Sequence, residues 1–218
     1  MFGFLRQKRR LGQVSAKPSL PALLKLVRVL VIDDDPNSFP IKALQSEGYS
    51  IEYWPNVENV GRLENGEFDI IILDIKGVAT QWSSQDGLGV LEHLKKRNPA
   101  QIIVAFSGET FDLNATRFFK LADETLPKPV DALKCKQVID GMLETSFTIQ
   151  HFWAGISKIL AADGASDKAI RAVEERIVEA IDRNGKVESA YFHALVKTMD
   201  HALVLASLTE SILKLSGH

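Results

Sequence analysis

Five short runs of apolar residues alternate with longer stretches of helical periodicity between Val27 and Met142. The runs are residues 27–32, 50–54, 68–73, 101–106 and 124–126. Three of them are rich in Val, Ile and Leu without polar alternation, which is typical of strands buried on both faces. Helical connections with right-handed crossovers place such strands in one parallel sheet with helices on both sides. The sequence therefore predicts an α/β fold with a doubly wound, five-stranded sheet.

Helical patterns fill the intervals between these runs and continue alone after Phe147. The expected helices of the α/β part cover residues 36–48, 57–63, 88–96, 112–121 and 130–142. Later apolar positions predict helices over 152–160 and 170–181, with Ser166 as a cap and Asn184-Gly185 as a stop. A last helix is expected to begin near Phe192 and to continue to Leu215. We therefore expect an α/β domain over 27–146 and a small all-helical region over 147–218.

The N-terminal residues 1–26 form a basic arm in this interpretation. Together with Arg28 they carry seven Lys and Arg and no acid, and Phe2, Phe4 and Leu5 stand beside the charges. One hypothesis is a disordered, solvated tail. The other is contact with an acidic partner or an anionic lipid surface.

Charge and cysteine content limit the partners that we expect. The whole chain has 26 Lys and Arg against 28 Asp and Glu, and residues 147–218 have eight against nine. This balance disfavours DNA binding. No run reaches the roughly 18 apolar residues of a membrane span, so stable membrane insertion is not expected. The single cysteine, Cys135, fits a buried thiol in a cytoplasmic protein.

Polar side chains follow four of the five apolar runs. Asp33, Asp34 and Asp35 follow the first and Asp74 the third, while Ser107 and Lys128 follow the fourth and fifth. In an open parallel sheet these positions meet at one edge, where ligands bind. Clustered carboxylates repel one another unless a cation sits among them, and oxygen ligands favour Mg²⁺. A carboxylate can also attack phosphorus to give an acyl phosphate, whose transition-state charge a metal, a lysine and a hydroxyl would stabilise.

Residues 27–143 resemble the receiver domain of bacterial two-component response regulators. The resemblance rests on Val31-Ile32-Asp33-Asp34-Asp35-Pro36, Ile71-Ile72-Leu73-Asp74, Asp86-Gly87, Phe106-Ser107-Gly108 and Leu126-Pro127-Lys128-Pro129. It implies a flavodoxin-like sheet of strand order 2-1-3-4-5 and a cis bond before Pro129. It also implies a phosphorelay function, in which a histidine kinase or phosphotransfer protein is the partner.

The same resemblance assigns a role to each residue of the expected site. Asp74 would be the phosphoacceptor, with Ser107 and Lys128 assisting the transfer. Mg²⁺ would be bound by Asp34 and Asp74, by Asp33 largely through water, and by the backbone carbonyl of Lys76, while Asp35 would be a bystander. The protein would catalyse only its own phosphorylation and dephosphorylation and would otherwise not be an enzyme. The C-terminal helices would provide output, for example by forming a homodimer.

Two departures from the family pattern stand beside this resemblance. The stretch 75–85 is several residues longer than usual, and Thr125 occupies a position that is often aromatic. The main alternative is a degenerate receiver that binds proteins independently of phosphorylation. A phosphohydrolase is less well supported because Asp74-Ile75-Lys76 lacks a second acid, and a flavodoxin-like cofactor carrier because three aspartates would repel its phosphate.

Overall fold

The computed structural model describes residues 9–14, 18–108 and 113–217, and its contacts divide the chain into two compact units. The first unit, Ser19–Phe147, holds all the strands found among the described residues. The second unit combines the residues from Thr148 onward with the described residues up to Pro18. The sequence analysis treated residues 1–26 as one arm. In the structure this segment is divided, because residues 9–14 belong to the helical unit and the segment after Pro18 belongs to the α/β unit.

The α/β unit is built on one parallel sheet with the strand order β2-β1-β3-β4-β5. Its strands are β1 (Arg28–Ile32), β2 (Ser50–Trp54), β3 (Ile70–Leu73), β4 (Ile102–Ser107) and β5 (Glu124–Pro127). The register pairs Val31 with both Tyr53 and Ile72, so the ends of β1, β2 and β3 lie at one edge. The predicted fold class and strand order are confirmed.

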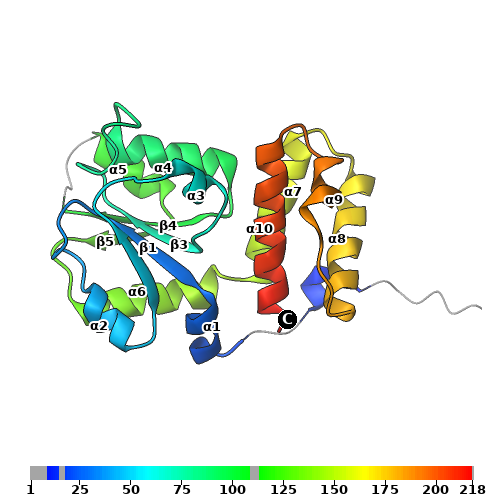
Figure 1. The fold of residues 1–218 in the computed structure, drawn as a ribbon, viewed down its shortest axis with the longest axis horizontal. Helices are drawn as coiled ribbons and strands as arrows, with labels where there is room; N and C mark the ends of the chain where they lie inside the picture. Colours follow the sequence, from blue (N-terminus) through cyan, green and yellow to red (C-terminus); the bar gives the residue numbers. More distant parts are fainter. Residues whose placement is uncertain (1–8, 15–17, 109–112, 218) are drawn as a thin grey trace, which may run out of the picture. The chain divides into compact units, whose positions relative to one another are not determined.

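Helices cover both faces of this sheet. They are α1 (Leu20–Leu26), α2 (Ile41–Ser46), α3 (Val60–Glu64), α4 (Asp86–Arg97), α5 (Leu113–Leu121) and α6 (Ala132–Thr145). Helices α3, α4 and α5 lie on one face, and α1, α2 and α6 lie on the other (Figure 1). The expected start of the fourth predicted helix, Asp112, lies outside the described residues.

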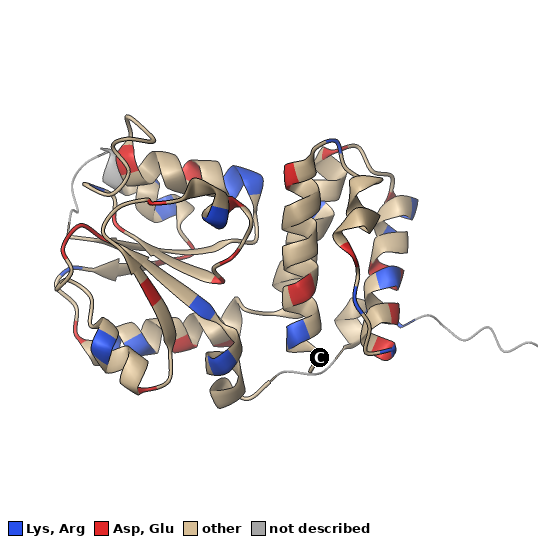
Figure 2. Ribbon diagram, in the orientation of Figure 1, with Lys and Arg blue, Asp and Glu red and all other residues tan. Residues whose placement is uncertain are grey.

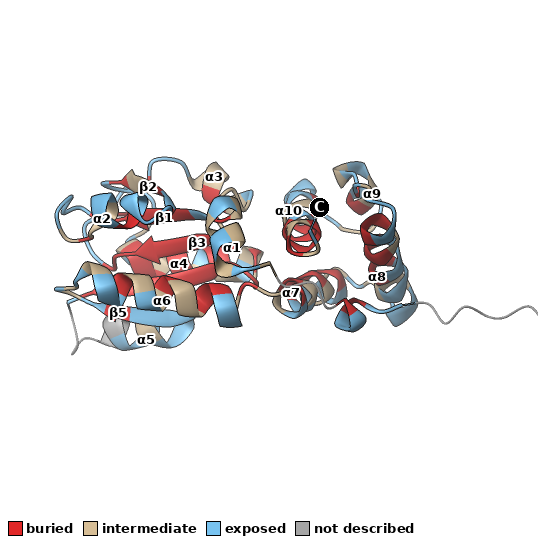
Figure 3. Ribbon diagram, turned by 90° about the horizontal axis from the view of Figure 1, so that it is seen from below, coloured by how far each residue is buried: buried red, intermediate tan, exposed pale blue. Residues whose placement is uncertain are grey.

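Burial explains why the central strands show no polar alternation. Every residue of β3 and β4 is buried, and Figure 3 shows this for β3. Leu30, Ile71, Ile103 and Phe118 belong to the core and are completely inaccessible to solvent. Burial of such side chains contributes about 1.5–3 kcal/mol each.

Helix α1 was not predicted. It has seven residues, begins after Ser19 with proline in its first turn, and buries only Leu23 completely. Its apolar residues are followed directly by those of β1, so apolar periodicity could not show where the helix ends and the strand begins. Proline near a helix start was the available signal.

The helical unit contains α7 (Ile149–Ala162), α8 (Asp167–Asp182), α9 (Ser189–His193) and α10 (Met199–Leu215). Ser166 caps α8 by accepting the N–H of Ala169, and Asn184 has a positive φ of 51° beyond the helix end. The predicted cap and stop of this helix are confirmed. No helix in the described part of the chain is long and apolar enough to span a membrane.

The prediction of one continuous helix from Phe192 to Leu215 was wrong. Helix α9 ends at His193, and α10 begins at Met199 after the N-cap Thr198, whose side chain accepts the N–H of His201. Asp163 also accepts the backbone N–H of Lys197 and contacts His201. The Thr198 bond satisfies one of the free N–H groups of a second helix start, and Asp163 fixes the residues beside it; apolar spacing alone does not reveal this start.

A buried carboxylate joins the N-terminal segment to the helical unit. The short 3-10 helix η1 (Leu11–Gln13) buries Leu11 almost completely. Glu174 of α8 accepts hydrogen bonds from Arg10 Nη1 at 2.7 Å and from the backbone N–H of Leu11 at 3.1 Å. In Figure 2, α8 carries charges of both signs. Two of these acids form ion pairs with the N-terminal segment: Asp182 with Arg9 and Glu174 with Arg10.

Candidate functional site

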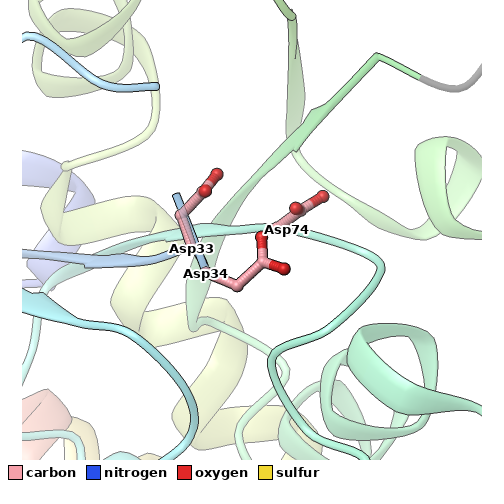
Figure 4. Close-up of side chains that lie close together, drawn as sticks. All are labelled: Asp33, Asp34 and Asp74. Carbon is pink, nitrogen blue, oxygen red and sulfur yellow. The ribbon is translucent and has the colours of Figure 1, made fainter. Parts of the chain in front are cut away.

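Three aspartates at the ends of two neighbouring strands form an acidic cluster. Asp33 and Asp34 follow β1, and Asp74 follows β3. One carboxylate oxygen from each residue lies within 4.8 Å of the other two (Figure 4). Asp33 and Asp74 are buried whereas Asp34 is exposed, so the cluster reaches from the interior to the surface. The parallel sheet brings these residues together as the sequence predicted.

The ammonium group of Lys128 compensates part of this negative charge. Lys128 directly follows β5, and its Nζ donates a hydrogen bond to Oδ2 of Asp74 at 2.7 Å. The same Nζ forms an ion pair with Oδ2 of Asp33. It also lies 4.7 Å from the centroid of the Phe106 ring, in a cation–π contact. Lys128 is thus placed where a developing negative charge on a group bound to Asp74 would be stabilised.

The pKa values of Asp74 and Lys128 are both raised. Burial raises the pKa of the Asp74 carboxyl because its ionised form loses solvation, and the hydrogen bond from Lys128 only partly opposes this. Burial alone would lower the pKa of Lys128, but its hydrogen bonds to Asp33 and Asp74 raise it above the ordinary value. Lys128 therefore remains a cation at neutral pH.

The other residues predicted for the site lie at the same edge of the sheet. Ser107 is the buried last residue of β4, and its carbonyl accepts the N–H of Lys128 at 3.2 Å. Lys76 is exposed and lies two residues after Asp74. The peptide bond between Lys128 and Pro129 is cis, as predicted. The chemical roles given to Ser107 and Lys76 stay predictions.

Tyr53, which sequence reasoning did not include, and Asp35, which it treated as a bystander, support the end of β1. The hydroxyl of Tyr53 donates to the backbone carbonyl of Asp33 at 2.5 Å, and burial together with the nearby aspartates raises the pKa of this phenol. Asp33 Oδ1 accepts the backbone N–H of Asp35 at 2.8 Å, and Asp35 Oδ1 accepts the N–H of Asn37. Asp35 therefore holds the turn after β1. The only sequence signal that Tyr53 lies near the site was its place near the end of β2, the strand expected beside β1.

The residues of the acidic cluster suit a hard divalent cation. All three groups are carboxylates, the kind of oxygen ligand that Mg²⁺ prefers. Among the described residues, the buried Oδ2 of Asp33 has the Lys128 ammonium as its partner. A cation at the cluster would give this atom a second partner of opposite charge. Asp33, Asp34 and Asp74 are therefore the side chains that could hold Mg²⁺.

Comparisons with known proteins give similarities among solved structures. Neither the protein-family models nor the curated proteins give a match. A CheY-like receiver domain from Methanospirillum hungatei is 25% identical and has a TM-score of 0.48, with 55% of this chain and 95% of that chain covered. The NtrX receiver domain from Brucella abortus is 27% identical, with a TM-score of 0.45 and coverage of 54% and 99%.

A third structure is the response regulator TrrA from Thermotoga maritima, in complex with Mg²⁺ and beryllium fluoride. It is 27% identical, has a TM-score of 0.44, and the match covers 53% of this chain and 98% of that chain. In all three cases nearly the whole of the smaller protein is matched. Over a little more than half of its length, this chain is similar to the receiver domains of response regulators.

Proposed function

We propose that this protein is a response regulator that accepts a phosphoryl group on Asp74 from a phosphohistidine. The observation that carries the proposal is the contact of Lys128 with Asp74 inside a cluster of three carboxylates. A nucleophilic carboxylate, a fixed cation and a set of metal-binding oxygens are the parts that phosphoryl transfer to an aspartate needs. The donor is a histidine kinase or a phosphotransfer protein.

In the proposed reaction, an oxygen of the Asp74 carboxylate forms a bond to phosphorus. The bond between phosphorus and the donor imidazole nitrogen breaks, and this nitrogen keeps the electron pair. Lys128 and the hydroxyl of Ser107 stabilise the charge on the transferred oxygens, and Mg²⁺ at the acidic cluster supplies further positive charge when it is bound. The backbone N–H of Ile75, 2.7 Å from Asp74 Oδ1, helps to keep the carboxylate oriented.

The proposed activity is limited to the chain itself. Asp74 takes up the phosphoryl group and later loses it to water, and no other substrate is turned over. Lys128 and Ser107 act on these two steps only. In this proposal phosphorylation shifts an existing equilibrium of the α/β unit, and the helical unit carries the output by binding a partner or a second copy.

The charge balance of residues 147–218 supports a protein partner of these helices rather than DNA. Residues 147–218 hold eight Lys and Arg against nine Asp and Glu, and several of these charges pair with one another on α8 and α10. Residues 147–218 thus carry no basic surplus that would bind a phosphate backbone, and Arg9 and Arg10 of the same unit pair with Asp182 and Glu174. We place the protein in the cytoplasm, where its single free thiol, Cys135, would stay reduced.

The test is incubation of the purified full chain with MgCl₂ and acetyl phosphate, followed by intact mass spectrometry. The proposal predicts one added phosphoryl group that requires Mg²⁺ and is absent in Asp74→Ala. Asp69→Ala is the matched control, because Asp69 lies at the opposite edge of the sheet, where it accepts the N–H of Arg28. A folded protein that gains no phosphoryl group supports a phosphorylation-independent binding scaffold instead.

A further inference from the structure

One carboxylate holds the first part of the long connection between β3 and α4. Asp86, the first residue of α4, accepts the backbone N–H of Gly77 through Oδ2 and that of Ala79 through Oδ1, both at 2.6 Å. Asp86 itself has a positive φ of 51°, which is uncommon for a residue with a side chain. Such a conformation persists where surrounding bonds determine it. Asp86 therefore fixes the path of the chain directly after Asp74.

Gly77 transmits this constraint to the acidic cluster. Its φ is +78°, and a Cβ atom at this position would overlap the carboxylate of Asp34. The backbone of Gly77 is thus packed directly against the side chain of Asp34. Because Asp34 is exposed, its carboxylate would otherwise be free to change rotamer at little cost. The Gly77 backbone blocks the rotamers of Asp34 that would place its carboxylate in the same space.

The far side of the connection has its own attachment. The carbonyl of Val78 accepts the N–H of Val57 at 2.6 Å. The side chains of Gln81 and Trp82 both donate to the carbonyl of Val57, at 3.1 Å and 2.7 Å. Val78 and Ala79 are buried in the core of the unit. Residues 77–82 are therefore held by Asp86 on one side and by Val57 on the other. These bonds fix the position of the Gly77 backbone beside Asp34.

We propose that Asp86 is a positioning residue for cation binding at the acidic cluster, acting through Gly77 on the carboxylate of Asp34. This inference rests on the proposed function, because it assumes that the cluster binds Mg²⁺. Asp86 does not contact the cation in this account. Groups that orient metal ligands typically change metal affinity by about 10- to 100-fold when they are removed.

The experiment is isothermal titration of the full chain with MgCl₂, at a temperature where circular dichroism shows every variant to be folded. Asp86→Ala should weaken Mg²⁺ binding by about tenfold, the lower end of the range for residues that orient metal ligands. Asp86→Asn keeps one acceptor oxygen and should lose less. Gly77→Ala leaves Asp86 intact but places a methyl group against Asp34, so it should also weaken binding.

Asp69→Ala is again the matched control, because Asp69 also accepts a backbone N–H, that of Arg28 at 2.8 Å, but at the other end of β1. It should leave the Mg²⁺ affinity unchanged, even if it lowers the unfolding midpoint as much as Asp86→Ala does. Unchanged affinity in Asp86→Ala or in Gly77→Ala, or an equal loss in Asp69→Ala, overturns the inference. If the wild-type chain itself binds no Mg²⁺, the metal part of the proposed function is overturned as well. This outcome is distinct from failure of the inference alone, in which the wild type binds Mg²⁺ and Asp86→Ala binds it equally well.

Discussion

Nζ of Lys128 lies 2.7 Å from Oδ2 of Asp74, although 54 residues separate the two in the sequence. The same ammonium pairs with Asp33, so one cation of the protein serves two buried carboxylates. Without it, Asp33 and Asp74 would face each other as unscreened like charges. Together with the proposed binding of Mg²⁺ at the acidic cluster, this arrangement of charges determines the expected response of the site to mutation, pH and Mg²⁺.

Removal of the Lys128 charge should destabilise the fold and make its stability depend on Mg²⁺. We expect Lys128→Met to lower the free energy of unfolding by roughly 3 kcal/mol, the lower end of the range for buried ion pairs that lose one partner, because Lys128 is partly exposed. Because Mg²⁺ at the acidic cluster would replace the lost charge, millimolar MgCl₂ should restore part of this loss. Urea denaturation at pH 7, with and without MgCl₂, measures both effects. Lys214→Met, which removes an ion pair with Glu210 on the surface of α10, should cost below about 1 kcal/mol, and equal losses would contradict the account.

The raised pKa of Asp74 predicts a component of stability that falls as pH rises. Between the ordinary value of 3.8 and the raised value, the folded state binds more protons at Asp74 than the unfolded state does. Stability must then decrease with increasing pH in this window, and the loss persists above it. Asp74→Asn lacks this component, so its stability relative to wild type should increase from pH 4 upward and then level off. Denaturation curves of both proteins across that range test the sign, and a relative stability that decreases with pH would refute it.

Glu174 should be essential to the attachment of the N-terminal segment to the helical unit. Its carboxylate is almost fully buried and accepts bonds from Arg10 and from the N–H of Leu11. Glu174→Ala leaves that N–H without its acceptor, which costs about 1–3 kcal/mol. Amide hydrogen exchange should therefore accelerate at residues 9–14. Glu175→Ala, at the exposed neighbouring position, should leave exchange there unchanged; the same acceleration in both variants would rule out a specific attachment.

The thiol of Cys135 should be inert in the native protein. Burial raises its pKa to about 12, and its side chain is inaccessible in α6. Thiol reagents attack the thiolate, which is scarce at neutral pH under these conditions. We expect no modification by iodoacetamide until the α/β unit unfolds, measured by mass spectrometry along a urea series. Fast labelling of the native chain would show that α6 opens readily.

The features that sequence could predict are those fixed by repeated patterns. Continuous apolar runs identified β3 and β4 because both faces of these strands are buried. The acidic cluster and Lys128 could be predicted together because parallel strands end at one edge. In contrast, the role of Asp86 depends on the path of the chain through Gly77 and Ala79, which no periodicity encodes.

Errors arose where local capping competed with apolar spacing. Phe192, Leu195, Met199 and Leu203 continue one helical pattern, yet the side chain of Thr198 begins a new helix in the middle of it. Similarly, the apolar residues of α1 and β1 form one continuous run, and only Ser19 and Pro21 mark the helix start. The attachment of Arg10 to Glu174 joins residues 164 positions apart, and neither residue shows this in its local sequence.

The most direct measurement is to locate the phosphoryl group on the chain. The full protein would be treated with acetyl phosphate and MgCl₂, reduced with borohydride to convert an acyl phosphate into homoserine, and digested for peptide mass spectrometry. The account predicts homoserine at position 74 alone, dependent on Mg²⁺ and strongly reduced in Lys128→Met. Conversion at Asp33, Asp34 or another acid, or none in a folded protein that binds Mg²⁺, would contradict the assignment of Asp74 as the phosphoacceptor.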